Sequence, residues 1–222
     1  MSEVCGGVIV AAGAGMRMRG ADKLFSVVAG RPLLAHAVAA FESCEDIDRV
    51  VLVTSEPNLE SALALVAEES FRKVAAVCSG GSRRQDSVRC GLAALGPCDL
   101  VAVHDGGRPL VRPGMISRGL EVARATGAAV PVVPLTDTIK EIDETGAITR
   151  TLDRSRLVAV QTPQVFRYDL LLRAHDEVAD EVTDDAAMVE ALGHSVATFE
   201  GSNRNIKITT SEDLMLAESY LH

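Results

Sequence analysis

The alternation of short apolar runs with helical patterns is the feature that most constrains how this chain folds. The apolar runs span residues 4–12, 49–54, 73–78, 100–104 and 128–133. Helical periodicity spans residues 31–44, 58–69, 83–95 and 113–126, with Pro32 suited to a first helical turn. Strands that are apolar on both faces and separated by helices are typical of a parallel sheet covered on both sides. We therefore predict one α/β domain over residues 1–222, Rossmann-like, with a mainly parallel sheet flanked by helices on both faces.

One polar segment breaks the alternation. Residues 136–151 have the pattern of a strand, a turn at 143–146 and a returning strand. Such a hairpin is only marginally stable alone, so we expect a protruding β-hairpin arm at about 134–156 that needs a partner surface, for example a second subunit. Beyond it we expect helices near 168–180, 183–192 and 211–221 and strands near 195–199 and 205–208.

Composition excludes several classes of protein. The 222 residues carry 22 Lys and Arg against 31 Asp and Glu, a net charge of -9, and only 3% are aromatic. An acidic chain with few stacking platforms argues against nucleic-acid binding. No apolar run approaches the ~18 residues of a membrane span, and the N-terminal residues lack the basic region of a signal peptide. We expect no membrane association.

The cysteines indicate a compartment. Their number is odd and no two form a C-x-x-C pair, which favours reduced thiols and a cytoplasmic protein over a disulfide framework or a zinc site. We expect small buried hydrophobic side chains at Cys5, Cys44, Cys78, Cys90 and Cys98.

The residues that carry chemistry should follow the strands, because ligands of such sheets bind beyond the carboxyl ends of the strands. The segments that do so are 11–23, 79–87 and 104–109. The first is rich in small residues and then carries Arg17, Arg19 and Lys23, which suits a polyphosphate. Met18 breaks a G-x-G-x-x-G dinucleotide fingerprint, and Ala21-Asp22 break a P-loop. A tight strand–helix turn with solvated charges is the competing interpretation.

The loop and seven further motifs, in register over nearly the whole chain, resemble the 2-C-methyl-D-erythritol 4-phosphate cytidylyltransferases, a family of GT-A-like nucleotidyltransferases. The first motif is Ala11-Ala12-Gly13-x-Gly15-x-Arg17-Met18 with Lys23. The others begin at Gly80-Gly81, His104-Asp105, Asp137-Thr138, Asp153-Arg154, Gln161-Thr162, Thr183-Asp184 and Asn205-Ile206. The chain departs from the family pattern at Val10, at Asp22 and Leu24, and at Gly106-Gly107, where the family has an Ala-Ala pair.

The resemblance implies transfer of CMP from CTP to 2-C-methyl-D-erythritol 4-phosphate with release of pyrophosphate, a step towards isoprenoid precursors. It also implies a homodimer that exchanges arms, and Mg²⁺ as cofactor with Asp105 as its ligand. The catalytic residues it implies are Arg17, Lys23, Arg154 and Lys207. The nucleotide-binding residues are Ala11, Ala12, Gly13, Ala14, Gly15, Gly81, Ser82, Ser87, Asp105 and Gly106. The residues for the alcohol phosphate are Asp105, Arg108, Thr138, Arg154, Thr162, Thr183 and Lys207.

Alternatives remain open for both single residues and the whole chain. His104 could be a hydrogen-bonded structural residue, Asp105 a loop cap, and Ser87 a helix-surface serine. The same chemistry could act on another alcohol phosphate, such as ribitol 5-phosphate. A nucleotide-binding regulatory module without turnover is the alternative from another class, and the four catalytic cations together argue against it.

Overall fold

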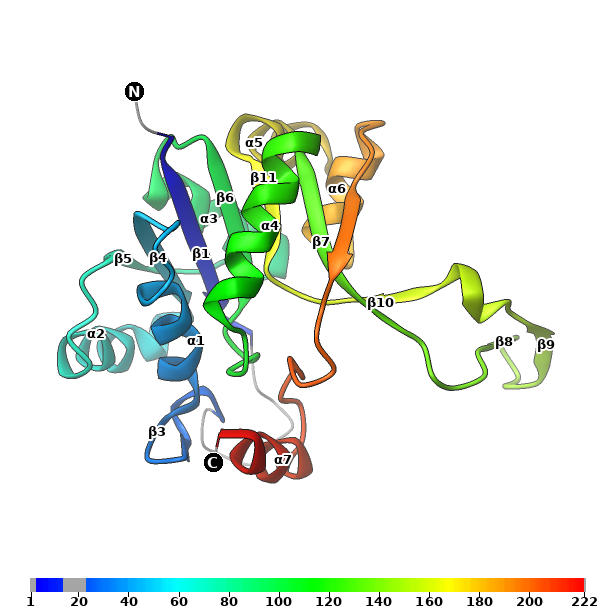
Figure 1. Ribbon diagram of the computed structural model, residues 1–222, viewed down its shortest axis with the longest axis horizontal. Coiled ribbons are helices and arrows are strands. Elements are labelled where there is room, and N and C mark those ends of the chain that lie inside the picture. The colour runs from blue at the N-terminus through cyan, green and yellow to red at the C-terminus, as the bar shows by residue number, and fades with distance from the viewer. Residues whose placement is uncertain (1–2, 14–22, 222) are drawn as a thin grey trace.

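The computed structural model describes residues 3–13 and 23–221, and an eight-stranded sheet forms its centre (Figure 1). The strands follow the order β10-β7-β11-β6-β1-β4-β5, with β12 beside β7. Their bounds are β1 (Cys5–Ala11), β4 (Arg49–Thr54), β5 (Val74–Ser79), β6 (Leu100–Asp105), β7 (Ala128–Pro134), β10 (Val158–Val160), β11 (Gln164–Arg167) and β12 (Ala197–Glu200). Two small pairs join β2 (Val27–Val28) to β3 (Arg31–Pro32) and β8 (Lys140–Ile142) to β9 (Ile148–Thr151).

Helices cover both faces of the sheet, as predicted. The α-helices are α1 (Leu33–Glu42), α2 (Leu59–Glu68), α3 (Arg84–Leu95), α4 (Pro113–Thr126), α5 (Tyr168–Glu177), α6 (Asp185–Ala191) and α7 (Ser211–Leu221). Short 3₁₀ turns occupy Lys23–Phe25, Glu56–Asn58 and Arg154–Arg156. Two apolar clusters result, one under α1, α2 and α4 and the other under α3, α5 and α6.

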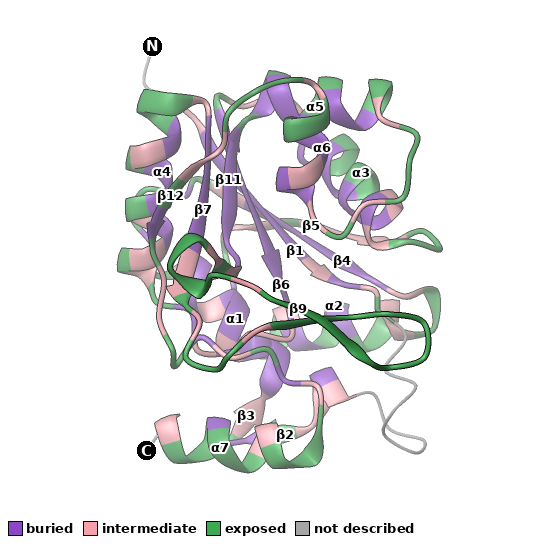
Figure 2. Cartoon of the chain, turned by 90° about the vertical axis from the view of Figure 1, so that its right-hand side faces the viewer, coloured by how far each residue is buried: buried purple, intermediate pink, exposed green. Residues whose placement is uncertain are grey.

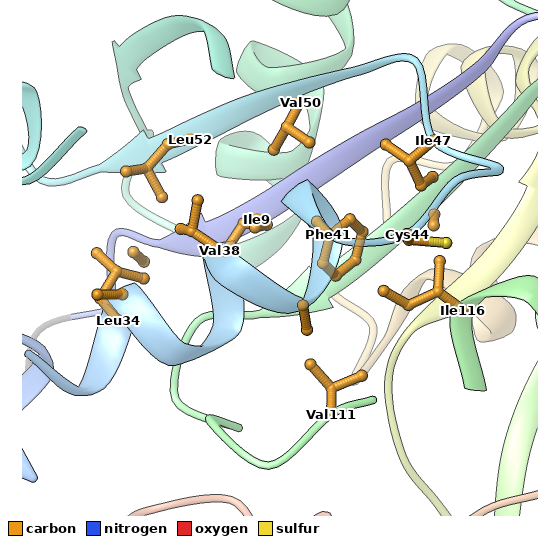
Figure 3. Packing of buried hydrophobic residues seen from close by; sticks show 14 of the residues in the cluster. Ile9, Leu34, Val38, Phe41, Cys44, Ile47, Val50, Leu52, Val111 and Ile116 are labelled. Carbon is orange, nitrogen blue, oxygen red and sulfur yellow. The ribbon is translucent and has the colours of Figure 1, made fainter. Parts of the chain in front are cut away.

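The alternation of side chains along each strand explains the two clusters. Val50 and Leu52 of β4 point to the α1 side, whereas Val51 and Val53 point to the α3 side. Figure 3 shows the α1 side, where Phe41 and Val38 lie over Ile9 of β1. A strand buried on both faces is apolar at every position, which is why the pattern of the sequence located β1, β4 and β6.

The parallel part of the sheet is confirmed, and its far side is more mixed. β1 pairs in parallel with β4 and β6, and β4 pairs in parallel with β5. β11 then runs antiparallel between β6 and β7, and β10 is antiparallel to β7. The carboxyl ends of β1 and β6 therefore lie side by side, which brings the segments after Ala11 and Asp105 together.

Two local predictions are wrong. Residues 205–208 form no strand; Asn205 and Ile208 are buried because Asn205 donates its side-chain amide to the Thr162 carbonyl and the Ile208 amide bonds the Gly107 carbonyl. Pro32 does not begin the first turn of α1; it is the N-cap residue, with extended backbone, and belongs to β3.

The arm is present as a hairpin. β8 and β9 pair only with each other, and the turn between them is held by the Asp143 carboxylate, which accepts from the Thr145 and Ala147 amides. The hairpin projects from the body of the chain (Figure 1) and is exposed along its length (Figure 2). Ile142 and Ile148 are 61% and 64% exposed, so the hairpin has apolar side chains without cover in this chain.

The cysteines are all free. Cys5 and Cys44 are buried and Cys78 and Cys98 are half-buried, but Cys90 is exposed, so the expectation of a buried side chain is wrong at that position. Within residues 3–13 and 23–221, no helix is long and apolar enough to cross a membrane.

Candidate active site

Two adjoining hollows open at the carboxyl ends of β1 and β6. The larger hollow, of about 450 Å³, is lined by Val10, Ala11, Ala12, Gly13, Lys23, Leu24, Gly81, Ser82, Arg83, Arg84, Ser87, Asp105, Gly107, Lys207 and Ile208. The smaller hollow, of about 350 Å³, is lined by Arg84, Asp105, Arg108, Val160, Gln161, Thr162, Gln164, Thr183, Asp184 and Lys207. Arg84, Asp105 and Lys207 belong to both linings. These three charged residues form a wall that is common to the two hollows.

The Asp105 carboxylate lies at the centre of this wall and is surrounded by cations. Its Oδ2 lies 2.8 Å from Lys207 Nζ and 3.8 Å from Arg108 Nε, and its Oδ1 accepts from Arg84 Nε at 3.2 Å. Burial would raise the pKa of Asp105, but the three cations outweigh burial and hold the pKa well below its ordinary value. Asp105 is therefore ionised at neutral pH.

The strand end behind Asp105 is fixed by a buried hydrogen-bond chain. The Asp105 amide donates to Thr162 Oγ1 at 3.1 Å, and Thr162 Oγ1 lies 2.9 Å from His104 Nδ1. His104 Nε2 lies 3.1 Å from the Arg108 carbonyl, which can only accept. Nε2 therefore carries the ring proton and Thr162 donates to Nδ1.

His104 is consequently a structural residue, one of the two interpretations its sequence position allowed. Burial lowers its pKa to about 4, against the opposing effect of its hydrogen bond to Arg108, so the ring is uncharged at neutral pH. Thr162 lines the smaller hollow, but its hydroxyl is already engaged by His104 and the Asp105 amide.

The small residues of the larger hollow bring two loops into contact. A Cβ atom on Gly80 would lie 2.5 Å from the Ala12 Cβ and 2.6 Å from Ser87 Oγ, so only glycine permits this approach. Ser87 is 2% exposed, so it is not a helix-surface serine; it accepts from the Gly81 amide and donates to the Arg83 carbonyl. Gly106 is buried, and its neighbour Gly107 lines the hollow in its place.

The cations of the two hollows come from distant parts of the chain. Lys23 Nζ donates to the Ile208 carbonyl at 2.7 Å, which joins the segment after the first loop to the segment that carries Lys207. Arg108 donates from Nη1 to the Asn205 carbonyl at 2.8 Å. The 205–208 segment, although no strand, thus positions Lys207 against Asp105.

The remaining predicted site residues fall into three groups. Ala14, Gly15 and Arg17 lie outside the described residues, so the structure does not test them. Thr138 and Arg154 are exposed in the arm, where Arg154 donates to the Thr136 carbonyl, and among the described residues neither lines a hollow. Thr183 is exposed and lines the smaller hollow, and its contact with the alcohol phosphate stays a prediction.

Two residues at or behind the wall were given no site role from the sequence, Arg84 and its partner Asp185. Arg84 donates from Nη1 to Asp185 Oδ2 at 2.7 Å, and the Asp185 side chain is 1% exposed. Both stand inside motifs that the resemblance rests on, beginning at Gly80 and Thr183. Their pairing joins positions 101 residues apart, and no local pattern carries that information.

The donor set can hold Mg²⁺ only with help from a ligand. No group of three or more His, Cys, Asp or Glu side chains in the described ranges is placed to hold a metal. Among the described residues that line the larger hollow, Asp105 is the only one with an acidic side chain. Mg²⁺ is commonly held by one or two carboxylates plus substrate phosphates, so Asp105 fits an ion that arrives with a triphosphate.

The arrangement suits a nucleoside triphosphate, because small-residue backbone lies beside converging cations at the strand ends of an α/β sheet. The fold and the site together define the class of nucleotidyltransferases. The chain belongs, within that class, to the 2-C-methyl-D-erythritol 4-phosphate cytidylyltransferase (IspD) family, whose model matches residues 5–222.

Relatives and solved structures agree with this assignment. The 2-C-methyl-D-erythritol 4-phosphate cytidylyltransferase of Dehalococcoides mccartyi strain CBDB1 is 51% identical over 221 residues, which cover 100% of this chain and 97% of that protein. The crystal structure of the Thermus thermophilus protein of the same name has 38% identity and a TM-score of 0.79, with 96% of this chain and 97% of that chain covered. The structure of 4-diphosphocytidyl-2C-methyl-D-erythritol synthase from Anaerococcus prevotii has 27% identity and a TM-score of 0.87, with 99% and 98% covered.

Proposed function

We propose that this chain transfers CMP from CTP to 2-C-methyl-D-erythritol 4-phosphate, forming the CDP-alcohol and pyrophosphate in isoprenoid precursor synthesis. The observation that carries the proposal is the pair of hollows that share Arg84, Asp105 and Lys207. CTP occupies the larger hollow and the alcohol phosphate the smaller one. The shared wall then lies where the two phosphate groups must meet.

The reaction is an in-line attack by a phosphate oxygen of the alcohol phosphate on the α-phosphorus of CTP. The P–O bond to the β-phosphate breaks, and pyrophosphate leaves with the electron pair. Such transfers depend mainly on positioning and on cations placed for the developing charge. Lys23 and Lys207, from opposite ends of the chain, supply positive charge that stabilises the developing negative charge beside Asp105. Arg17 is proposed as the third cation.

No general base is required, because the attacking phosphate is already ionised. The neutral, fully buried His104 is consistent with this, since its ring nitrogens are both engaged inside the fold. Asp105 is ionised, and beside its contacts with the three cations each carboxylate oxygen can accept a further hydrogen bond from a substrate hydroxyl. Its proposed tasks are therefore binding and orientation.

The cytosine base is held by backbone and hydroxyl groups in this proposal. Ala11, Ala12, Gly81, Ser82 and Ser87 line the larger hollow, and it has no aromatic side chain among its described lining residues. Hydrogen bonds from a rigid backbone can distinguish the edge of a pyrimidine, because an unmatched base would leave buried polar groups unpaired.

Mg²⁺ is proposed as the cofactor, held by Asp105 and the triphosphate. When bound, the ion neutralises charge on the transferring phosphate. The chain's own cations already surround Asp105 at 2.8–3.8 Å, so they orient this carboxylate before any ion arrives. Chelation by EDTA is expected to stop pyrophosphate release, and addition of MgCl₂ is expected to restore it.

We propose a homodimer in which each arm completes the site of the other subunit. The support is that the arm projects from the body of the chain (Figure 1), that its residues Thr138 and Arg154 line neither hollow, and that Ile142 and Ile148 are exposed. Deletion of residues 138–151 should abolish both dimerisation and activity. A fully active monomer in sedimentation and turnover measurements would contradict this proposal.

We also propose a cytoplasmic location, which the free thiols support.

The central experiment measures pyrophosphate release from CTP and Mg²⁺ with each alcohol phosphate in turn. Release with methylerythritol phosphate, and little with ribitol 5-phosphate, is the expected result. The opposite preference would overturn the substrate assignment. Lys23→Ala should lower turnover about 10²-fold, by analogy with the loss of one stabilising donor; unchanged turnover would contradict the proposed mechanism.

A further inference from the structure

A series of ionisable side chains in contact runs from α5 and α6 to the wall shared by the two hollows. His175 Nε2 lies 3.4 Å from Asp185 Oδ1, Asp185 Oδ2 accepts from Arg84 Nη1 at 2.7 Å, and Arg84 Nε donates to Asp105 Oδ1 at 3.2 Å. The His175 and Asp185 side chains are 2% and 1% exposed. Of these four residues, Arg84 and Asp105 line the hollows, whereas His175 and Asp185 lie behind them.

The guanidinium of Arg84 fixes the distance between two carboxylates that belong to different elements. Asp105 ends β6, and Asp185 is the first residue of α6. Because the guanidinium is planar and rigid, Nε and Nη1 cannot move independently. A lysine would keep the positive charge but has a single nitrogen, which cannot hold both carboxylates in this geometry.

The Asp105 carboxylate is thereby prevented from rotating. Arg84 occupies Oδ1 while Lys207 Nζ lies 2.8 Å from Oδ2, so any rotation breaks one of the two contacts. Asp185 is held in turn by the first turn of α6, where Asp184 accepts from the Ala187 amide and Gln164 bonds both Asp184 and the Ala186 amide. The orientation of Asp105 therefore depends on α6.

We propose that Arg84 and Asp185 are positioning residues for the transferase reaction, and that they act by holding the Asp105 carboxylate in its reactive orientation. The inference rests on the proposed function, because the reaction supplies its readout. Misplacement by about 1 Å of a group that orients a reactant can lower a rate ~10²-fold. The pair should thus control turnover more than it controls CTP binding.

The test compares Arg84→Lys and Asp185→Asn with the wild-type enzyme in the pyrophosphate assay, per mole of folded protein. Arg84→Lys should lower kcat by about 10²-fold and change the KM for CTP less than about threefold. Arg89→Lys is the matched control, because Arg89 lies on the same helix and pairs with Asp176 at the surface; it should leave kcat and KM unchanged.

The double variant separates positioning from simple stabilisation. Asp185→Asn should lower kcat about tenfold in the wild-type background and hardly at all in the Arg84→Lys background, because it acts through Arg84. A structural ion pair would instead lower the melting temperature and leave kcat per folded molecule unchanged. That result, additive effects on kcat, a rise in KM alone, or failure of both single variants to fold would each overturn the inference. An inactive wild-type enzyme would overturn the proposed function and the inference together.

Discussion

Gly106 and Gly107 offer a paired test of packing at the site, because the family pattern has alanine at both positions. Neither glycine has a positive φ, so each backbone can accept alanine. A Cβ on Gly107 would meet only the Ile208 carbonyl oxygen, at 3.8 Å. A Cβ on Gly106 would lie 2.8 Å from Leu34 Cδ1 and 3.3 Å from the Val10 carbonyl oxygen. The two substitutions should therefore have opposite effects on stability.

The magnitudes follow from two contributions. Replacing glycine by alanine restricts the unfolded chain and stabilises by about 0.4–1 kcal/mol wherever the native backbone permits it. Gly107→Ala should gain this amount, and at 2–4 °C per kcal/mol its melting temperature should rise by roughly 1–4 °C. Gly106→Ala gains the same amount but overfills a site beside fully buried Leu34, at a cost of about 1–3 kcal/mol.

The difference between the two variants isolates the steric cost, since both share the unfolded-state contribution. With a mid-range cost of about 2 kcal/mol, Gly106→Ala should melt roughly 4–8 °C below Gly107→Ala. Thermal unfolding followed by circular dichroism measures this gap. Adding Leu34→Val to Gly106→Ala should recover part of the loss, with a coupling of about 0.5 kcal/mol or more. A Gly106→Ala variant as stable as Gly107→Ala would refute the reasoning.

Three further predictions concern the wall, the thiols and the metal. Lys207→Met removes the Nζ atom that lies 2.8 Å from Asp105 and should lower kcat about 10²-fold in the pyrophosphate assay. Lys73→Met is the control: Lys73 Nζ bonds the Cys44 carbonyl, and its loss should leave kcat unchanged. Burial raises the pKa of Cys5 to about 12 and of Cys98 to about 11, so at pH 8 their thiolate fractions are only about 10⁻⁴ and 10⁻³. Ellman's reagent should therefore label exposed Cys90 first, and Cys90→Ser should remove the fast phase; rapid labelling of Cys5 would contradict this. Mg²⁺ should raise the melting temperature in the presence of CTP and have little effect without it, because Asp105 alone is a weak donor set.

The sequence predicts the parallel half of the sheet well and the other half less well. β1, β4 and β6 are buried on both faces, so nearly every residue in them is apolar and the run is visible. β10 and β11 have three and four residues, too few for a period to emerge beside Thr162 and Pro163. Residues 205–208 are predicted as a strand, yet the buried residues Asn205 and Ile208 lie three positions apart, which does not fit the two-residue alternation of a strand. A side-chain hydrogen bond and a single backbone hydrogen bond hold them in place of a ladder.

The site follows the same division. Residues that line the larger hollow, such as Ala12, Lys23 and Asp105, stand at or soon after strand ends, where topology alone places them together. Arg84 and Asp185 meet only because α3 and α6 cover the same face of the sheet, and that contact is a property of the whole fold. Gly107, not Gly106, lines the larger hollow, a difference of one residue that depends on how the chain turns after β6.

The wall common to the two hollows has a thermodynamic consequence. Because Arg84, Asp105 and Lys207 line both, a negatively charged occupant of one hollow changes the electrostatic environment met by an occupant of the other. By linkage, the factor by which CTP changes the affinity for the alcohol phosphate must equal the factor by which the alcohol phosphate changes the affinity for CTP. Two reactants bound beside one carboxylate thus change each other's affinity before any bond is made.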